Sequence, residues 1–287
     1  YSKTYMKTIT SIEEMKKWSR LALSNNKSIG FVATMGCLHE GHLSLIKTST
    51  AECDNTVVSI FVNQTQFSPE EDFDSYPRNI KSDKLILQTA GVDIMFNPAQ
   101  KDLYPEEFQT FVTVEKKTNY LCGVSRPRFF RGVTTVILKL FNIIKPNTAY
   151  FGEKDWQQLQ VVRTMVRDLN MDVSIVGKPI VRDKDGLAMS SRNLNLSKSE
   201  RRTALTLTQA LEIVQTLVTK GESSAVNIRA KIQETIEKKQ GAKIDYISVC
   251  DPENFKEQTE IHSRVLVALA VRIGTTRLID NRIIEKN

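Results

Sequence analysis

An apolar run that breaks into a histidine-bearing loop and then resumes as an amphipathic pattern constrains this chain more than any other stretch. Its residues are Gly30-Phe31-Val32-Ala33-Thr34-Met35-Gly36-Cys37-Leu38-His39-Glu40-Gly41-His42-Leu43. The pattern predicts a strand ending near Val32, a turn at Gly36 and a helix that begins before Leu43. In such a unit the backbone N–H groups of the helix start and the rings of His39 and His42 face one point, which suits a phosphate.

His39 and His42 also permit two other interpretations. In a Rossmann-type unit they are equally well explained as ordinary residues of a loop and a helix start. Zinc requires more ligands than two imidazoles, and only Cys37 stands at an obvious ligand spacing. The spacing alone therefore leaves the phosphate site and the ordinary loop open and disfavours zinc.

The first half of the chain alternates short β-rich runs with helical patterns, which is typical of a parallel sheet with crossover helices. The expected strands cover residues 28–32, 56–62, 92–96, 147–151 and 172–176. Apolar residues at helical spacing follow between Val133 and Ile144 and between Leu159 and Leu169. Residues 117–132 are interpreted as a basic loop that leads into a helix beginning at Val133. We therefore predict an α/β fold whose Rossmann-like, nucleotide- and substrate-binding domain spans residues 1–182.

A second pattern begins after a polar linker. Ser197 and Glu200 have the spacing of a capping box ahead of a helix that ends at Gly221, and another helix carries apolar residues from Ile228 to Ile236. Strand-like runs at 243–249, 265–271 and 276–280 predict a small antiparallel sheet. These elements predict a smaller α+β domain at residues 183–287, which carries the segment Met189-Ser190-Ser191-Arg192-Asn193.

The composition of the 287 residues, with 40% hydrophobic and 25% charged, is typical of a soluble enzyme with two cores. Neither a stretch of the ~18 apolar residues that cross a bilayer nor a secretory signal is evident, so we expect a cytoplasmic protein without a membrane partner. The four scattered cysteines favour reduced thiols. The motif Met6-Lys7-Thr8-Ile9 is typical of a natural start, which makes residues 1–5 an expected addition.

The net charge of +7 permits nucleic-acid binding but does not favour it. Lysines and arginines are spread along the chain among acidic residues, and the excess suits anionic small substrates equally well. We therefore expect no nucleic-acid partner.

Three further segments carry side chains suited to binding. Asn63 and Gln66 follow the second expected strand and have amides that can bind hydroxyls or a carboxylate without titrating. Lys154 follows another strand end, where it can neutralise phosphate oxygens, and the Ser190-Ser191-Arg192 segment can bind a polyphosphate. Taken one by one, each is more simply explained as part of a solvated loop.

Taken together and in this order, the segments resemble those of pantothenate synthetases, the pantoate–β-alanine ligase family of nucleotidylyltransferases. Residues 34–42 resemble the extended His-x-Gly-His signature, and 61–67 resemble the Phe-Val-Asn-Pro-x-Gln-Phe block. Residues 152–158 match Gly-Glu-Lys-Asp-x-Gln-Gln, and 185–193 resemble the counterpart of the Lys-Met-Ser-Lys-Ser loop. The departures from the family pattern are Ala33, Cys37, Gln64, Arg128 and Phe129.

This resemblance implies that ATP and Mg²⁺ drive the condensation of pantoate with β-alanine through a pantoyl adenylate, with release of AMP and pyrophosphate. It assigns catalysis to His39, His42, Lys154 and Arg192. It assigns ATP contacts to these four and to Met35, Gly36, Gly152, Glu153, Asp155, Val181, Met189, Ser190 and Ser191. It assigns pantoate and β-alanine contacts to Asn63, Gln66 and Gln158, leaves Mg²⁺ mainly to the ATP phosphates, and suggests a homodimer.

Two rival functions remain open. Another nucleotidylyltransferase would share His39 and His42 but would have no use for the amides of Gln66 and Gln158. A basic nucleic-acid-binding module, from a different class of protein, would require basic and aromatic residues clustered on one face.

Overall fold

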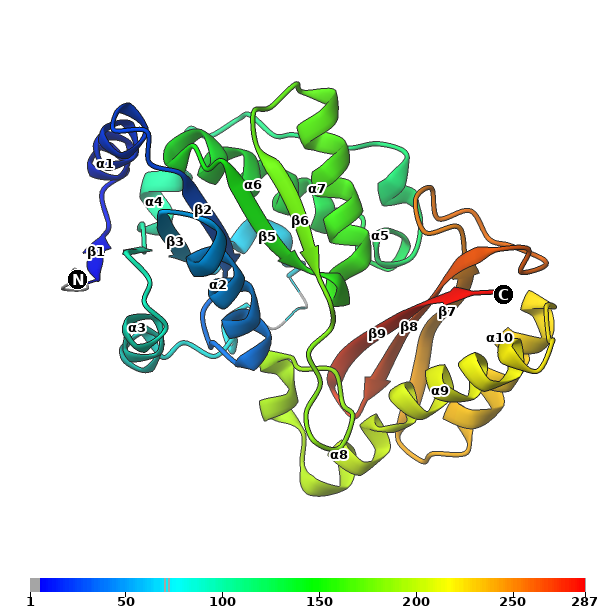
Figure 1. The fold of residues 1–287 in the computed structure, drawn as a ribbon. Coiled ribbons are helices and arrows are strands. Elements are labelled where there is room, and N and C mark those ends of the chain that lie inside the picture. The colour runs from blue at the N-terminus through cyan, green and yellow to red at the C-terminus, as the bar shows by residue number, and fades with distance from the viewer. Residues whose placement is uncertain (1–5, 70, 72, 287) are drawn as a thin grey trace. The chain divides into compact units, whose positions relative to one another are not determined.

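The computed structural model describes residues 6–69, 71 and 73–286, so the expected addition at residues 1–5 lies outside the described residues. Two compact units divide the chain (Figure 1). The first contains the residues up to Val114, Arg128–Glu153 and Gln158–Pro179, and the second contains Glu115–Pro127, Lys154–Gln157 and Ile180–Asn287. The domain bounds 1–182 and 183–287 stay a prediction.

The first unit is built on a six-stranded, all-parallel sheet, as the alternating pattern predicts. Its strands stand in the order β1-β4-β3-β2-β5-β6. Their bounds are β1 Lys7–Ile9, β2 Ile29–Thr34, β3 Asn55–Ile60, β4 Ile94–Phe96, β5 Thr148–Gly152 and β6 Ser174–Lys178. The short edge strand β1 was not predicted, because three residues are too few to show an alternating pattern.

Helices cover both faces of this sheet (Figure 1). They are α1 Ile12–Ser24, α2 Glu40–Glu52, α3 Ile80–Thr89, α4 Gln100–Leu103, α6 Phe129–Ile144 and α7 Trp156–Asp168. Successive strand residues point to opposite faces, so Phe31 packs edge-on against Phe141 of α6, whereas Val32 shares a cluster with Ile46 of α2. Burial of both faces explains why β2 has an apolar run instead of an alternating pattern.

The order of the strands reverses at β2. From there the chain builds outward to β3 and β4 on one side, and β5 and β6 continue on the other. The carboxyl ends of β2 and β5 therefore lie beside each other at the point where open α/β sheets bind their ligands.

One predicted boundary in this unit is wrong. The sequence was interpreted as a basic loop over residues 117–132 with a helix from Val133, whereas α6 begins at Phe129. Phe130 is buried and lies three and seven residues before Val133 and Ile137, so it extends the apolar face of α6 by one turn. The same predicted loop also contains η2 (Lys117–Asn119) and α5 (Cys122–Ser125).

The second unit combines helices with a small antiparallel sheet, as predicted. The strand order is β7-β8-β9, and helices pack on one face of the sheet. The strands are β7 Ala242–Cys250, β8 Arg264–Ile273 and β9 Thr276–Glu285, and the helices are α8 Lys198–Ala204, α9 Thr206–Thr219 and α10 Ala225–Glu237. The predicted capping box of Ser197 and Glu200 is present. The single helix expected after it is two helices, which meet at Leu205.

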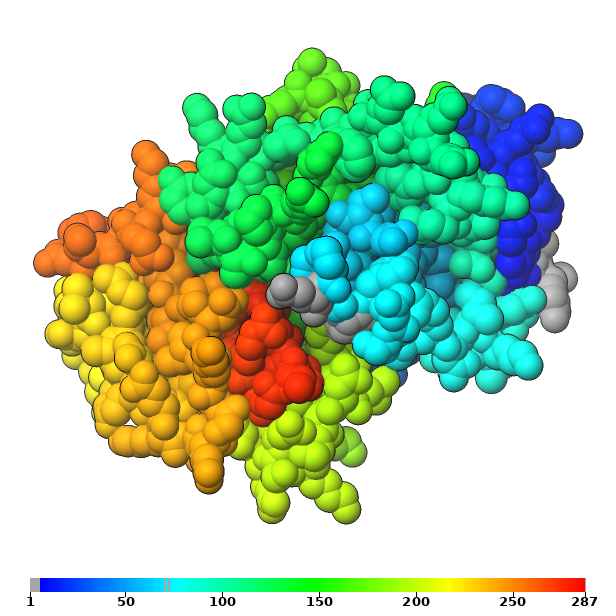
Figure 2. Space-filling model, turned by 180° about the vertical axis from the view of Figure 1, so that it is seen from behind, coloured from blue at the N-terminus to red at the C-terminus, as the bar shows by residue number. Residues whose placement is uncertain are grey.

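Figure 2 shows the loop after β3 (cyan) at the surface of the first unit, beside the segment that follows α4 (blue-green). A hydrogen bond of 3.4 Å from the Thr65 hydroxyl to that of Tyr104 joins the two segments. Within the described part of the chain, no helix combines the length and the apolar character needed to cross a bilayer.

Candidate functional site

The two histidines cap the helix that follows β2. His39 is the N-cap of α2, where its Nδ1 accepts a hydrogen bond of 3.2 Å from the Gly41 N–H, and His42 Nδ1 accepts one of 3.4 Å from the His39 N–H. The ring centroids lie 4.1 Å apart. Because each Nδ1 accepts, each neutral ring carries its proton on Nε2. The start of this 13-residue helix therefore carries two imidazole N–H groups where its dipole already favours an anion.

A buried carboxylate fixes the turn before these histidines. Asp83, in the first turn of α3, is 2% exposed and accepts hydrogen bonds from the N–H groups of Cys37 at 2.9 Å and Leu38 at 2.8 Å. Gly36 and Cys37 have φ values of +84° and +52°, which are costly for a residue with a side chain. Burial, and then the charge of Asp83, raise the pKa of the Cys37 thiol. Asp83 thus stabilises a strained turn that aims α2.

Sequence analysis missed Asp83, because an acidic residue in the first turn of a helix is adequately explained by the helix dipole. Its role depends on a contact 45 residues away, between its Oδ1 and the N–H of Leu38. A short local pattern carries no signal for such a contact.

The amide side chains predicted for substrate binding lie together in η1 (Gln64–Gln66) and next to it. Asn63 Nδ2 donates to Gln66 Oε1 at 3.0 Å and to the Gly132 carbonyl at 3.1 Å, while its Oδ1 accepts from the Thr65 hydroxyl at 2.9 Å. Asn63 is 1% exposed. Gln66 Nε2 lies 3.2 Å from Met35 Sδ, which joins this cluster to the loop after β2. Asn63 therefore orients Gln66.

Gly132 of α6 makes this arrangement possible. A Cβ atom there would lie 2.4 Å from the Thr65 carbonyl oxygen and 2.6 Å from the Gln66 nitrogen. Any side chain at Gly132 would therefore push the η1 backbone, and Gln66 with it, away from α6. Placing Gly132 in a loop, as the sequence suggested, hid this requirement.

At the end of β5, Gly152 and Glu153 belong to the first unit, and Lys154 and Asp155 belong to the second. Nothing lies within 4 Å of the place where a Cβ of Gly152 would stand. Lys154 and Asp155 belong to the short helix η3 (Glu153–Asp155), and their charged groups are 3.9 Å apart. The Lys154 side chain is 19% exposed.

Two buried residues anchor this segment within the second unit. Trp156 Nε1 donates to the Pro252 carbonyl at 2.7 Å. Gln157 donates to the carbonyls of Lys117 and Tyr120 and accepts from the Cys122 N–H. Sequence analysis did not single out Gln157, whereas Gln158, the predicted pantoate contact, is half-buried and begins the part of α7 that belongs to the first unit.

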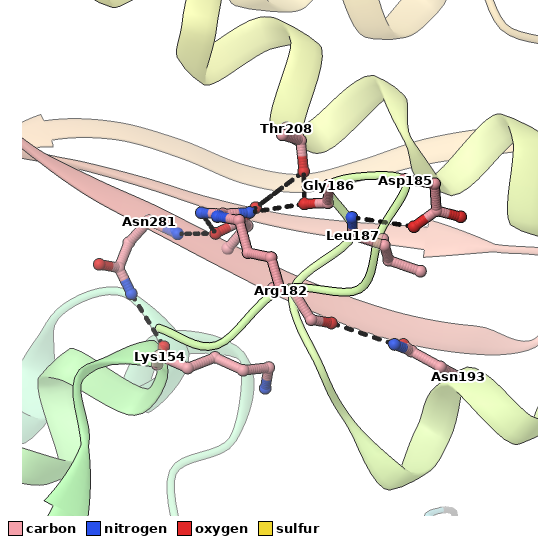
Figure 3. A network of polar contacts seen from close by, with 10 residues as sticks. Lys154, Arg182, Asp185, Gly186, Leu187, Asn193, Thr208 and Asn281 are labelled. Carbon is pink, nitrogen blue, oxygen red and sulfur yellow. Dashed lines mark hydrogen bonds and ion pairs between the residues drawn. The ribbon is translucent and has the colours of Figure 1, made fainter. Parts of the chain in front are cut away.

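The Ser190-Ser191-Arg192 segment follows a tight hairpin in the second unit. Asp183 N–H donates to the Leu187 carbonyl at 2.8 Å, and Met189 N–H donates to the Val181 carbonyl at 3.0 Å. Ser190 caps the short helix η4 (Ser191–Asn195) by accepting a hydrogen bond of 3.3 Å from the Arg192 N–H. Figure 3 shows the polar contacts that hold this hairpin, which we call the 181–189 hairpin.

The described residues offer no group of three or more His, Cys, Asp or Glu side chains arranged to hold a metal ion.

The predicted site residues divide between the two units. The first unit holds Met35, Gly36, His39, His42, Asn63, Gln66, Gly152, Glu153 and Gln158. The second holds Lys154, Asp155, Val181, Met189, Ser190, Ser191 and Arg192. The first unit therefore holds the imidazole donors of His39 and His42, and the second holds the cations Lys154 and Arg192.

Comparison with known proteins identifies relatives over nearly the whole chain. The family model described as Pantoate-beta-alanine ligase matches residues 7–283. A pantothenate synthetase of Acetivibrio thermocellus is 51% identical over 280 residues, which cover 98% of this chain and 100% of that relative. The crystal structure of pantothenate synthetase from Thermus thermophilus superposes with a TM-score of 0.91 at 40% identity, covering 96% of this chain and 99% of that one.

A third relative carries ligands. The crystal structure of pantoate-beta-alanine ligase from Francisella tularensis, complexed with beta-gamma ATP and beta-alanine, has a TM-score of 0.79 at 36% identity. The match covers 97% of this chain and 97% of that one.

Proposed function

This chain belongs to the pantoate–β-alanine ligase family, and from that premise we propose that it joins pantoate to β-alanine through a pantoyl adenylate, using ATP and releasing AMP and pyrophosphate. The observation that carries this proposal is the pair of imidazoles at the start of α2, whose Nδ1 atoms accept backbone hydrogen bonds. Because the Nδ1 atoms accept, the ring protons stand on the Nε2 atoms, and we assign these N–H groups to a phosphate of ATP. The Francisella relative, whose structure holds an ATP ligand and β-alanine, supports ATP and β-alanine as ligands.

In the first step, a carboxylate oxygen of pantoate attacks the α-phosphorus of ATP. The bond between that phosphorus and the bridging oxygen breaks, and pyrophosphate leaves with the electron pair. We assign stabilisation of the charge on the α-phosphoryl oxygens to His39, His42 and Lys154, because positioned donors act most strongly where charge develops. Ser190, Ser191 and Arg192 bind the β- and γ-phosphates in this proposal, and Mg²⁺ bound with ATP would supply further neutralisation of phosphate charge.

In the second step, the neutral amine of β-alanine attacks the acyl carbon of the adenylate. The carbon–oxygen bond to AMP breaks, and the nitrogen loses a proton as the amide forms. No covalent bond to the protein is required, so the side chains position groups and neutralise charge.

The remaining proposed contacts follow the chemistry of the side chains. Gln66 and Gln158 bind pantoate, with β-alanine beside Gln66, and Asn63 belongs to the same set because it orients Gln66. The other proposed ATP contacts are Met35, Gly36, Gly152, Glu153, Asp155, Val181 and Met189. We also propose a cytoplasmic homodimer.

The amide cluster favours this reaction over that of another nucleotidylyltransferase. Asn63 is buried, and its amide binds Gln66 Oε1, the Gly132 carbonyl and the Thr65 hydroxyl. A nucleotide transfer to a phosphate acceptor would use cations at such a place, whereas an uncharged amide suits the hydroxyls of pantoate.

Isotope exchange tests the adenylate. Enzyme incubated with pantoate, Mg-ATP and labelled pyrophosphate, without β-alanine, should return label to ATP because the first step is reversible. Omission of pantoate should abolish the exchange. Label that enters ATP only after β-alanine is added, or that enters without pantoate, would contradict the proposed intermediate.

A further inference from the structure

We propose that Asp280 and Asn281, adjacent residues of β9, are positioning residues for two phosphate-binding segments of the second unit. Asn281 holds the main chain of Lys154, and Asp280 holds the 181–189 hairpin that leads into Ser190. The inference rests on the proposed function, because it takes the ATP-binding roles of those two segments from there.

Strand geometry explains how one dipeptide reaches two segments. Neighbouring residues of a strand point to opposite faces of its sheet. Asp280 shares a face with Leu278 and Ile284, which pack in the cluster with α9 and α10, whereas Asn281 shares a face with Ile283, which packs in the cluster with Trp156. β9 is also an edge strand, so its far side is open to contacts from loops.

Asp280 holds the hairpin through an arginine. Its carboxylate, 2% exposed, accepts two hydrogen bonds from Arg182, at 2.7 Å from Nη1 and at 2.9 Å from Nη2. Arg182 Nη1 also donates to the Gly186 carbonyl and to the Thr208 hydroxyl, each at 3.1 Å, and that hydroxyl lies 2.9 Å from the same carbonyl. The charge pair therefore joins β9, α9 and both sides of the hairpin in one network.

The hairpin is tied down at further points. Arg201 of α8 binds the carboxylates of Asp183 and Asp185, at 2.8 and 2.9 Å. Asn193 of η4 donates to the Ala188 carbonyl at 3.0 Å, next to the start of the phosphate-binding segment (Figure 3). A shift of the hairpin would thus move Ser190 with it.

Asn281 holds the other segment from the opposite face of the sheet. Its Nδ2 donates a hydrogen bond of 2.8 Å to the Lys154 carbonyl, and Figure 3 shows the two residues side by side. The backbone N–H of Asn281 donates to Asp280 Oδ1 at 2.8 Å. The same oxygen accepts the hydrogen bond from Arg182 Nη2, so the two contacts of β9 are linked. Asn281 is 7% exposed although it lies on an edge strand, so its hydrogen bond to the Lys154 carbonyl is shielded from water.

The two anchors should affect different kinetic quantities. Lys154 is proposed to act on charge that develops during adenylate formation, so loss of its anchor should slow that step with little effect on ATP affinity. The hairpin is proposed to serve the β- and γ-phosphates, which are bound before and during the reaction. A looser hairpin should therefore weaken ATP binding equally in the ground state and in the transition state.

The test uses the whole enzyme and two measurements. Single-turnover pyrophosphate release, with pantoate and Mg-ATP but without β-alanine, reports adenylate formation, and titration with Mg-ATP reports affinity. Asn281→Ala should slow release about tenfold and leave the ATP Kd within about twofold. Thr208→Val, which keeps the side-chain shape and loses the hydroxyl, should weaken ATP binding about fivefold and leave the rate of release nearly unchanged.

A double-mutant cycle separates positioning from general damage. If Asn281 acts through Lys154, Asn281→Ala should have no further effect on release in an enzyme that already carries Lys154→Ala. Ile284→Val, a buried change on the same strand away from both segments, serves as the control for lost stability and should leave both quantities unchanged. Asn281→Asp, which keeps the size and removes the donor, replaces Asn281→Ala if that variant fails to fold.

Independent, multiplicative effects of the Asn281 and Lys154 substitutions would overturn the positioning role. Equal losses of rate and affinity in Asn281→Ala and Thr208→Val would do the same. Failure of the proposed function has a different signature, because the unmodified enzyme would then release no pyrophosphate in response to pantoate.

Discussion

The turn before α2 and the 181–189 hairpin lead into the two segments for which we propose phosphate binding, and they are held in different ways. In the first, the Asp83 carboxylate accepts hydrogen bonds from two backbone N–H groups. In the second, the Asp280 carboxylate pairs with the Arg182 guanidinium, and further side chains donate to the hairpin carbonyls or bind its carboxylates. Backbone donors are present whatever the sequence, so the turn depends on one side chain, whereas the hairpin depends on several.

The comparison shows where each region is vulnerable. An ion pair in a buried position is costly to break from one side, because the charge left behind has no partner. A pair of backbone N–H groups that loses its acceptor costs less, since Cys37 and Leu38 are only half-buried and carry no charge that would be left unpaired. Removal of the Asp280 carboxylate should therefore lower the free energy of unfolding more than removal of the Asp83 carboxylate. Loss of any single other contact of the hairpin should cost less, because several side chains hold it.

The largest expected effect follows from this difference. Asp280→Ala should lower the free energy of unfolding by about 3–5 kcal/mol, because Arg182 keeps its charge with 22% of its side chain exposed. Asp83→Ala should cost about 1–3 kcal/mol. Urea unfolding followed by circular dichroism measures both, and an equal or larger loss in Asp83→Ala would reverse the comparison.

The next effect concerns chemistry in the second unit. Lys154→Ala should lower turnover by at least about 100-fold in a folded protein, since one preorganised donor at developing charge is worth that much. Lys184→Ala, an exposed lysine of the 181–189 hairpin, is the matched control and should retain its turnover. Near-normal turnover of a folded Lys154→Ala enzyme would remove Lys154 from the mechanism.

A smaller effect tests whether Gln158 binds pantoate or ATP. Gln158→Ala should weaken pantoate binding by about 1–3 kcal/mol, because a polar group of the substrate loses its partner, and should leave ATP binding nearly unchanged. Calorimetric titration with each ligand measures the two affinities. A defect confined to ATP would show that Gln158 belongs to the nucleotide set instead.

The smallest effect reports the Asp83 contact directly. Burial and the nearby carboxylate raise the pKa of the Cys37 thiol, so a smaller fraction of it should be the reactive thiolate at a given pH than for an ordinary cysteine. Asp83→Asn removes the charge and one of the two acceptor oxygens, so Cys37 should be alkylated by iodoacetamide a few-fold faster at about pH 8. Peptide mass spectrometry resolves this site, with Cys53 as the internal reference, and an unchanged rate would argue against the influence of Asp83.

Local patterns predicted most elements of both units. The expected strand at 147–151 corresponds to β5 at Thr148–Gly152, and the capping box at Ser197 starts α8 as expected. The errors fall where a local pattern is short or is replaced by tertiary packing. β1 has three residues, and Phe130 joins α6 because the core accepts its side chain.

The sequence by itself determined the parallel and antiparallel sheets and the family of this chain, because periodicity and motifs are properties of neighbouring residues. Tertiary structure decided how the candidate site residues are held. Gly132 is required by the η1 backbone, which lies far earlier in the chain, and Asp280 pairs with Arg182 98 residues before it. Such contacts depend on which residues the fold brings together, and the free energy of a carboxylate near a guanidinium or two N–H groups exists only once those groups meet.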